Sequence, residues 1–217
     1  MDTAKAKSEQ LYVAFIDFQK AYDYVFRDGL FYKMLRSQMI GPVYRIIYSM
    51  YESVSSVVRQ GLDVSSVIYQ HVGLRQGCIL SPCLFSLFIA DFPKYLEESK
   101  CIGVQLHNEW VRILLYADDG ALVAQSADDL QHMLDALHAY CAKWRLFVNT
   151  DKTKVIVFNH TSRTHVWLQN KPVFTYNGSV LEIVDEFKYL GVLFHTHIRH
   201  TAALEHRLTQ SKRLVAM

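Results

Sequence analysis

Hydrophobic and polar positions follow two different periods along this chain of 217 residues. A compact run rich in β-branched and aromatic residues, Leu11 to Ile16, ends at Asp17 and predicts a buried strand. From Leu30 to Met50 the apolar residues recur at three and four positions, which predicts helices. Gly41-Pro42 interrupts that spacing, so two helices with a break between them are expected.

The next part of the chain predicts a hairpin followed by a helix. Ser53 to Gln60 and Val67 to Val72 have the composition of two strands, and Gly61 lies in the turn between them. Ser81-Pro82 then opens a helix, because proline is well tolerated in a first turn. The apolar face of this helix is expected to contain Leu84, Phe85, Phe88, Ile89 and Phe92.

Two adjacent acids interrupt the following apolar stretch. Asp118 and Asp119 stand between Val111 to Leu115 and Gly120 to Ala124, which predicts a buried hairpin with both carboxylates at its tip. Like charges repel and burial removes their hydration, so a bound divalent cation is the usual compensation. The pattern therefore predicts a metal site. The alternative is a solvated turn formed by Asp119-Gly120.

The last part of the chain predicts one long helix, several strands and a terminal helix. Ser126 is a helix cap, followed by apolar residues at three- and four-residue spacing as far as Trp144. A basic amphipathic helix is expected at Ala202 to Val215. Strands are expected at Lys154 to Asn159, Val166 to Leu168, Val173 to Tyr176 and Phe187 to Phe194, the middle two forming a second hairpin.

This order of elements favours an α+β domain. Strands that pair on one side and helices that collect on the other are typical of layered, ferredoxin-like folds, in which helices cover one face of an antiparallel sheet. The length allows one substantial core or a domain with an appended subdomain. No internal repeat, low-complexity segment or linker is present.

The composition indicates a folded globular protein but does not decide its function. A hydrophobic fraction of 51% and a charged fraction of 20% are typical of a folded globular protein. The net charge of +2 neither requires nor excludes a nucleic-acid partner. The basic residues gather late in the chain: Lys143, Arg145, Lys152, Lys154, Arg199, His200, His206, Arg207, Lys212 and Arg213.

The N-terminus and the cysteines indicate an intracellular protein. Met1 to Gln10 is polar, so no signal peptide is expected, and the longest apolar stretch, Cys83 to Ala90, is too short to span a membrane. The four cysteines form no C-x-x-C pair. We expect reduced and mostly buried thiols in a chain that has no membrane segment.

Two further segments carry candidate chemistry. Asp17 directly follows the first strand, and three acids converge if that strand pairs beside the acidic hairpin. Acids on different strands can hold two hard cations about 4 Å apart. A cap or a strand-ending turn is the alternative for Asp17. The loop Gly73 to Gly77 lets its backbone approach a ligand, and Arg75 suits phosphate, although an ordinary turn has the same pattern.

Five segments together resemble the successive motifs of reverse transcriptases, particularly those of non-long-terminal-repeat retrotransposons. They occur in order at Phe15 to Asp23, Gly73 to Pro82, Tyr116 to Asp119, Leu146 to Lys154 and Phe187 to Val192. The resemblance covers residues 11 to 195, and five motifs in order are far more specific than one.

The resemblance implies a polymerase palm and a metal site. It implies a polar tail at 1–10, the palm with partial fingers at 11–196 and the start of a basic thumb helix at 197–217. Asp17 and Asp118 would hold two Mg²⁺ ions, which Mn²⁺ could replace, with Asp119 beside them and the Phe18 carbonyl completing the shell. One ion would activate the primer 3′-hydroxyl and the other would hold the triphosphate.

The resemblance also implies residues that contact the nucleotide. Tyr22 falls at the steric-gate position that favours deoxynucleotides, and Gln76 at a nucleotide contact, with Arg75 and Gly77 beside it. Lys152 resembles a lysine that protonates the pyrophosphate or stabilises its charge. Phe187 to Val192 resembles the primer grip. Taken singly, these positions also suit a core aromatic, a surface lysine and a core strand.

The implied function is RNA-directed DNA synthesis from an RNA template, a DNA primer and deoxynucleoside triphosphates. Several neighbouring segments of the family pattern are missing, including the basic part of the fingers, an endonuclease and a ribonuclease H segment. The chain is therefore expected to be a fragment of a retroelement polyprotein with poor processivity. A catalytically silent nucleic-acid-binding palm is the main alternative. Tyr22 and the Tyr116 to Asp119 motif argue against an RNA polymerase or a nucleotide cyclase.

Overall fold

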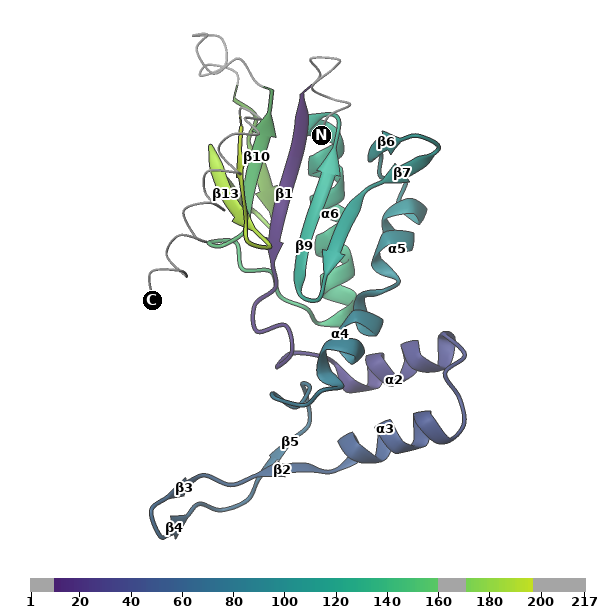
Figure 1. Cartoon of the computed structure of the whole chain (residues 1–217), viewed down its shortest axis with the longest axis vertical. Coiled ribbons are helices and arrows are strands. Elements are labelled where there is room, and N and C mark those ends of the chain that lie inside the picture. Colours follow the sequence, from purple (N-terminus) through teal and green to yellow (C-terminus); the bar gives the residue numbers. More distant parts are fainter. Residues whose placement is uncertain (1–9, 160–170, 197–217) are drawn as a thin grey trace, which may run out of the picture.

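A mixed six-stranded sheet forms the centre of the molecule (Figure 1). The computed structural model describes residues 10–159 and 171–196. The sheet order is β11-β12-β10-β1-β9-β8, and its pairs are antiparallel except for the parallel pair of β10 and β12. The ferredoxin-like sheet predicted as antiparallel thus contains one parallel pair. The strands are β1 (Leu11–Asp17), β8 (Ile113–Tyr116), β9 (Asp119–Ala124), β10 (Lys154–Phe158), β11 (Phe174–Tyr176) and β12 (Ser179–Ile183).

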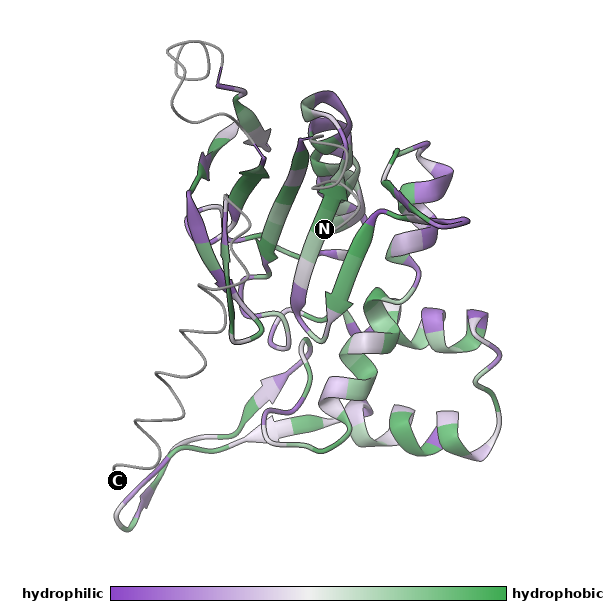
Figure 2. Ribbon diagram, turned by 45° about the horizontal axis from the view of Figure 1, so that its top comes forward, coloured by the Kyte–Doolittle hydropathy of each residue, from purple (hydrophilic) through white to green (hydrophobic). Residues whose placement is uncertain are grey.

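The predicted first strand is confirmed as β1 and lies between β9 and β10. Its even-numbered residues join the core under the helices, and its odd-numbered residues join a second core on the opposite face. Both faces are covered, which explains why the run is continuously apolar instead of alternating. Hydrophobic residues accordingly follow the central strands (Figure 2).

One face of the sheet is covered by α6 (Ala127–Trp144), the predicted long helix. Its N-cap, Ser126, accepts a hydrogen bond at 3.0 Å from the Asp129 amide, as the cap motif predicts. Asp128 and Asp129 in the first turn favour the positive end of the helix dipole. The apolar stripe of α6 is buried at Leu130, Met133, Leu134, Ala136, Leu137, Tyr140, Cys141 and Trp144.

Four shorter helices lie beside and below the sheet in the view of Figure 1. The expected break at Gly41-Pro42 separates α2 (Arg27–Arg36) from α3 (Pro42–Glu52). The helix that was expected to continue to Phe92 is instead two helices, α4 (Ser81–Ile89) and α5 (Phe92–Glu98). A proline in the first turn of α5 cannot continue α4, so the chain bends there.

Lys33 stabilises that bend from the middle of α2. Its buried ammonium donates to the Phe88 carbonyl at 2.6 Å, to Asp91 at 2.6 Å and to the Tyr140 hydroxyl at 2.7 Å. Burial lowers the pKa of Lys33 to about 8, although its bond to Asp91 acts in the opposite direction. One charged side chain thus connects α2, the α4–α5 bend and α6.

A long hairpin extends away from the core (Figure 1). The predicted pairing is confirmed by β2 (Val54–Ser56) with β5 (Ile68–Gln70) and, further out, β3 (Arg59–Gln60) with β4 (Asp63–Val64). A second hairpin, β6 (Val104–Leu106) with β7 (Glu109–Val111), was not predicted. Most of its residues are exposed, so no buried face produces an alternating pattern.

Arg27 fastens the long hairpin to the rest of the fold. Its side chain is only 6% exposed. Its guanidinium donates to the carbonyls of Gly73 at 2.8 Å, Tyr51 at 3.2 Å, Gln70 at 2.6 Å and Val72 at 3.1 Å. These carbonyls lie on both sides of the hairpin base, so one side chain holds the two arms together.

The predictions for the C-terminal third need two corrections. β11 pairs with β12, which was not predicted, and the expected partner Val166 to Leu168 lies outside the described residues. The expected last strand is a hairpin of β13 (Glu186–Tyr189) and β14 (Val192–His195), because the turn residues between them have φ values of +47° and +78°. The 1–9 part of the predicted tail and the helix expected at Ala202 to Val215 lie outside the described residues.

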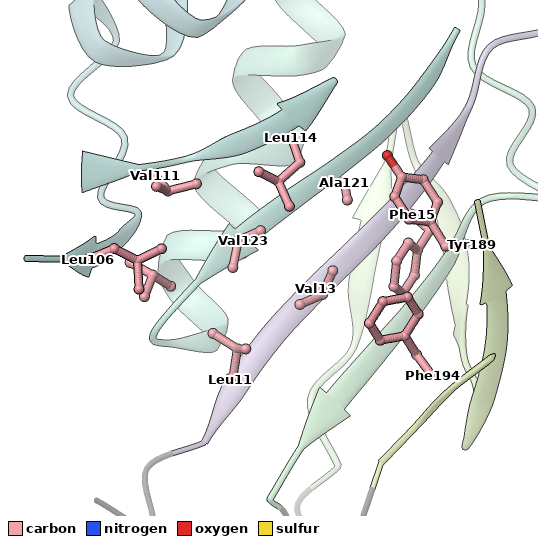
Figure 3. A pocket seen from close by; sticks show the side chains of 11 residues that line it. Leu11, Val13, Phe15, Leu106, Val111, Leu114, Ala121, Val123, Tyr189 and Phe194 are labelled. Carbon is pink, nitrogen blue, oxygen red and sulfur yellow. The ribbon is translucent and has the colours of Figure 1, made fainter. Parts of the chain in front are cut away.

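The β13–β14 hairpin packs on the face of the sheet opposite α6 (Figure 3). Phe15 of β1 stacks on Phe187, with 4.7 Å between ring centroids, and also contacts Tyr189 at 5.1 Å and Phe194 at 5.8 Å. An apolar cavity of about 270 Å³ lies between this aromatic cluster and the β6–β7 hairpin. The hairpin is therefore held by aromatic contacts at one end of β1.

Within residues 10–159 and 171–196, no helix is long and apolar enough to cross a membrane. All four cysteines are free, as predicted. Only Cys101 and Cys141 are buried, while Cys78 is half-buried and Cys83 is exposed. The expectation of mostly buried thiols therefore holds for two of the four.

Replacement of Arg27 by lysine should destabilise the fold by about 2–4 kcal/mol. A lysine ammonium is a point charge and cannot reach the four carbonyls that the planar guanidinium binds. Urea unfolding monitored by circular dichroism measures the change. Arg36→Lys on the exposed end of the same helix is the matched control, and an equal effect of the two substitutions would contradict the tethering role.

Candidate active site

The pairing of β1 with β9 brings the three predicted acids to one end of the sheet. Asp17 lies opposite Asp119 in the last pair of the two strands. Residues directly opposite each other in an antiparallel pair project to the same face. Asp118 precedes Asp119 in the turn that connects β8 to β9. The pairing of the first strand beside the acidic hairpin, on which the expected convergence depends, is thus confirmed.

The acidic turn has Ala117 and Asp118 as its two central residues. β8 ends at Tyr116, which pairs with Asp119, so Asp119-Gly120 is not the turn dipeptide of the alternative interpretation. Ala117 has a φ of +52°, a region that alanine rarely adopts and that often marks functional sites. β8 is an edge strand with Tyr116 66% exposed, so this arm of the hairpin is less buried than predicted.

A cavity of about 420 Å³ lies in front of Asp17 and Asp118. It collects residues from four of the five sequence motifs, which are far apart in the chain. Its lining includes Asp17, Phe18, Gln19, Lys20, Ala21, Tyr22, Asp23, Gln76, Asp118, Asn149 and Lys152. Six of the nine predicted site residues therefore meet in one space.

Asp119 lies at a second cavity of about 380 Å³, next to the first. Asp17 and Lys152 line both spaces, and Phe187 and Tyr189 of the β13–β14 hairpin line the second one. Although Asp119 is exposed overall, its partial burial and then the charges of Asp118 and Asp17 raise the pKa of its carboxyl. The ionised carboxylates therefore repel one another.

The oxygen donors at this end of the sheet fit Mg²⁺. Magnesium prefers oxygen ligands, keeps several waters and is commonly held by one or two carboxylates together with substrate phosphates. Asp17 and Asp118 supply two such carboxylates at one cavity. Among the described residues no three His, Cys, Asp or Glu side chains converge on one point.

Phe18 can add a carbonyl oxygen to this donor set. The Phe18–Val148 bridge is flanked by hydrogen bonds from the Gln19 amide to the Phe147 carbonyl at 2.7 Å and from the Asn149 amide to the Asp17 carbonyl at 2.8 Å. Phe18 and Val148 therefore form a pair that exchanges no hydrogen bond. The Phe18 carbonyl consequently points away from Val148, toward the β9 side.

Tyr22 stands at the wall of the first cavity. Its half-buried ring packs on Phe85 with 5.3 Å between centroids. Burial and then the charge of Asp118 raise the pKa of its hydroxyl. Its backbone carbonyl accepts a hydrogen bond at 2.7 Å from the Leu74 amide, which ties the backbone of Tyr22 to the loop that begins at Gly73.

The loop that begins at Gly73 approaches the backbone of the Tyr22 segment closely. The amide of Gly73 donates to the Val25 carbonyl at 2.9 Å, and a Cβ on Gly73 would lie 2.5 Å from the Asp23 carbonyl oxygen. Gly73 also has a φ of +83°, so glycine is required here on two grounds. This glycine thus allows the loop to pack directly against the backbone that follows Tyr22.

The residues predicted after Gly73 separate into two groups. Gln76 lines the first cavity, and its amide donates to the Asp23 carboxylate at 2.9 Å. The Arg75 guanidinium instead donates to the Met50 carbonyl at 2.8 Å and lies over the Tyr51 ring. Arg75 and Gly77 do not line the cavity. Their predicted contact with a nucleotide stays a prediction.

Sequence reasoning assigned no role to Asn149, Thr153 or Asp23, although all three lie inside the quoted motifs. Asn149 and Asp23 line the first cavity, and buried Thr153 contacts Asp17. The signal in the sequence was the Asn-Thr-Asp-Lys run, since asparagine often bonds to its own backbone two residues later. That bond is present, from the Asp151 amide to Asn149 Oδ1 at 3.2 Å.

The chain matches a known protein family over most of its length. Residues 1–194 fit the family described as "Reverse transcriptase (RNA-dependent DNA polymerase)". The chain belongs to the reverse transcriptase family. The resemblance recognised in the motifs is thereby confirmed.

Relatives of this reverse transcriptase chain come from mobile elements. The "RNA-directed DNA polymerase from mobile element jockey" of Drosophila funebris is 33% identical over 98% of this chain. The "Probable RNA-directed DNA polymerase from transposon BS" of Drosophila melanogaster is 33% identical over 82% of it. The chain spans only 23% and 19% of these two proteins.

Solved structures confirm the predicted α+β palm. A structure of apo telomerase from Candida tropicalis, truncated from its C-terminal domain, aligns with a TM-score of 0.60 over 90% of this reverse transcriptase chain and 36% of that chain. Telomerase from Candida albicans aligns with a TM-score of 0.55 over 93% of this chain and 34% of that one. At 16% and 15% identity these matches speak for the fold alone.

In the absence of divalent ions, Asp118→Asn should stabilise this reverse transcriptase chain at pH 7. A raised carboxyl pKa means that the folded state disfavours ionised Asp119, so stability is lost as the pH rises through that pKa. The substitution removes one of the repelling charges. The gain should be about 0.5 kcal/mol or less, because solvent screens exposed charges.

Two measurements check this expectation. A carbon-13 NMR titration in EDTA should show that Asp118→Asn lowers the pKa of Asp119, and urea unfolding should show a gain at pH 7 that disappears once both carboxyls are protonated. Asp135→Asn, an exposed acid on α6, is the control. An unchanged Asp119 pKa would show that the two acids do not interact.

Proposed function

We propose that this chain carries the nucleotidyl-transfer site of an RNA-directed DNA polymerase, which joins a deoxynucleotide to a primer 3′-hydroxyl. The observation that best supports the proposal is that Asp17 and Asp118 share one cavity with Tyr22, Gln76 and Lys152. Two carboxylates alone suit many metal sites. The aromatic ring, the amide and the ammonium beside them suit a sugar, a base or ribose contact and a polyphosphate.

Asp17 and Asp118 would hold two divalent cations, Mg²⁺ or Mn²⁺, with the Phe18 carbonyl as a further oxygen ligand. When bound, such ions lower the pKa of the primer hydroxyl and neutralise charge on the triphosphate. The rigid strand end positions Asp17, and the short turn positions Asp118. Asp119, next to them, adds negative charge that favours cation binding.

The remaining residues would bind and orient the nucleotide. The Tyr22 ring would lie under the sugar and exclude a 2′-hydroxyl by its bulk. The Gln76 amide would contact the incoming nucleotide once it leaves Asp23. The Lys152 ammonium, at the border of both cavities, would give a proton to the leaving pyrophosphate or balance its charge.

The proposed partners are an RNA template, a DNA primer and deoxynucleoside triphosphates. The β13–β14 hairpin would hold the primer end, since Tyr189 connects it to the acids through a 3.4 Å bond to the Asp119 carbonyl. Because the chain covers about a quarter or less of its relatives, we propose that it acts within a longer retroelement polyprotein.

Asp118→Asn should reduce incorporation of a single deoxynucleotide on a primed RNA template by on the order of 10³-fold. The amide cannot supply the negative charge that a cation requires, while the turn is kept. Binding of the primed template, measured by fluorescence anisotropy, should be unchanged. Asp135→Asn is the matched control on a distant helix. If wild type and Asp118→Asn bind the template alike and neither incorporates, the catalytically silent alternative is correct.

Tyr22→Ala should lower the preference for deoxynucleotides over ribonucleotides by roughly 10- to 100-fold, because removal of the ring opens space under the sugar. Tyr22→Phe keeps the ring and should keep the preference. Single-turnover incorporation of each nucleotide with Mg²⁺ measures the ratio. An unchanged ratio in Tyr22→Ala would reject the gate and leave Tyr22 as a packing residue on Phe85.

A further inference from the structure

The strand that carries Asp17 loses one of its two neighbours just before the acid. β1 pairs with β9 as far as Asp17–Asp119, but its pairing with β10 stops at Phe15–Lys154. The amide and carbonyl of Asp17 face the side where β10 no longer pairs. A strand end without partners would let the carboxylate move, so other groups must hold it.

The turn from Asn149 to Thr153 supplies both partners. The Asp17 amide donates to the Thr153 hydroxyl at 3.2 Å, and the Asp17 carbonyl accepts from the Asn149 amide at 2.8 Å. Thr153 is 0% exposed, so water does not compete for its hydroxyl. The Gln19 amide donates to the Phe147 carbonyl at 2.7 Å, so the contacts between the two segments continue beyond Asp17.

The same turn determines where Lys152 lies. The Thr153 amide donates to the Asn149 carbonyl at 2.9 Å and closes the turn. Asn149 Oδ1 accepts from the amides of Asp151 at 3.2 Å and Lys152 at 3.3 Å, so its side chain folds the backbone that carries the lysine. Asp17 and Lys152 are thus held by one small unit, and both line the two cavities.

We propose that Thr153 and Asn149 are positioning residues: Thr153 orients the metal-binding Asp17, and Asn149 orients Lys152. The inference rests on the proposed function. It deepens that function by giving a role to two side chains that bond to the backbone amides of Asp17 and Lys152. A purely structural threonine would stabilise the fold without affecting how the site binds a cation.

The test of Thr153 uses the full 217-residue chain, with Mn²⁺ as the probe and no nucleotide. Thr153→Val keeps the shape and removes the acceptor, so calorimetric Mn²⁺ affinity should fall roughly 2- to 10-fold. Hydrogen exchange at the Asp17 amide should accelerate. Thr153→Ser keeps the hydroxyl and should restore both readings, and Thr175→Val on the distant strand β11 should match wild type.

Asn149 is tested separately through the rate of incorporation. Asn149→Ala removes the side-chain acceptor but keeps the backbone amide that holds Asp17. It should therefore reduce kcat roughly 10- to 100-fold with unchanged Mn²⁺ affinity. Asn149→Asp retains an acceptor oxygen for the turn and should recover most of the rate. A fall in Mn²⁺ affinity equal to that of Thr153→Val would contradict the division of roles.

The outcomes separate this inference from the proposed function. If Thr153→Val lowers the unfolding midpoint but leaves Mn²⁺ affinity and Asp17 exchange as in wild type, Thr153 is structural only and the inference fails. If the wild-type chain binds Mn²⁺ through Asp118 but incorporates nothing, the proposed function fails while the Thr153 result stands. Absence of any Mn²⁺ site that Asp118→Asn removes would overturn both.

Discussion

The antiparallel register between β1 and β9 is the constraint on which the candidate site depends. β1 is buried on both faces, so its register with β9 is fixed by two cores at once. A slip of one residue would turn every side chain of β1 to the opposite face. It would also carry Asp17 away from Asp119. Burial of the apolar strand thus offsets the repulsion among the acids that collect at its end.

The three acids are not equivalent, because they stand on different kinds of backbone. Asp17 and Asp119 belong to strands and share the face that the β13–β14 hairpin covers, whereas Asp118 belongs to a two-residue turn. Two adjoining cavities result, one with Asp118 and the other with Asp119, and Asp17 and Lys152 border both. This geometry separates the space at Asp118, where we propose that the nucleotide binds, from the space next to the hairpin.

Sequence patterns predicted the elements that have a buried apolar run or face and missed an exposed hairpin and contacts between distant segments. β1, α6 with its Ser126 cap and the acidic hairpin were predicted because burial leaves a local apolar pattern, which is a continuous run in β1 and a helical period in α6. The β6–β7 hairpin has almost no buried face, so its sequence shows no such pattern. In the site, the contact of Thr153 with Asp17 was not predicted because the two residues are 136 positions apart in the sequence. Such a side-chain to backbone bond produces no local pattern.

The attachment of the long hairpin has a mechanical consequence. Arg27 binds carbonyls on both sides of the hairpin base, and the last of these, Gly73, begins the loop that carries Gln76. The long hairpin is therefore joined to the rest of the fold at its base through the Arg27 guanidinium. The base of the hairpin and the loop that brings Gln76 to Asp23 therefore share one anchor, the Arg27 guanidinium.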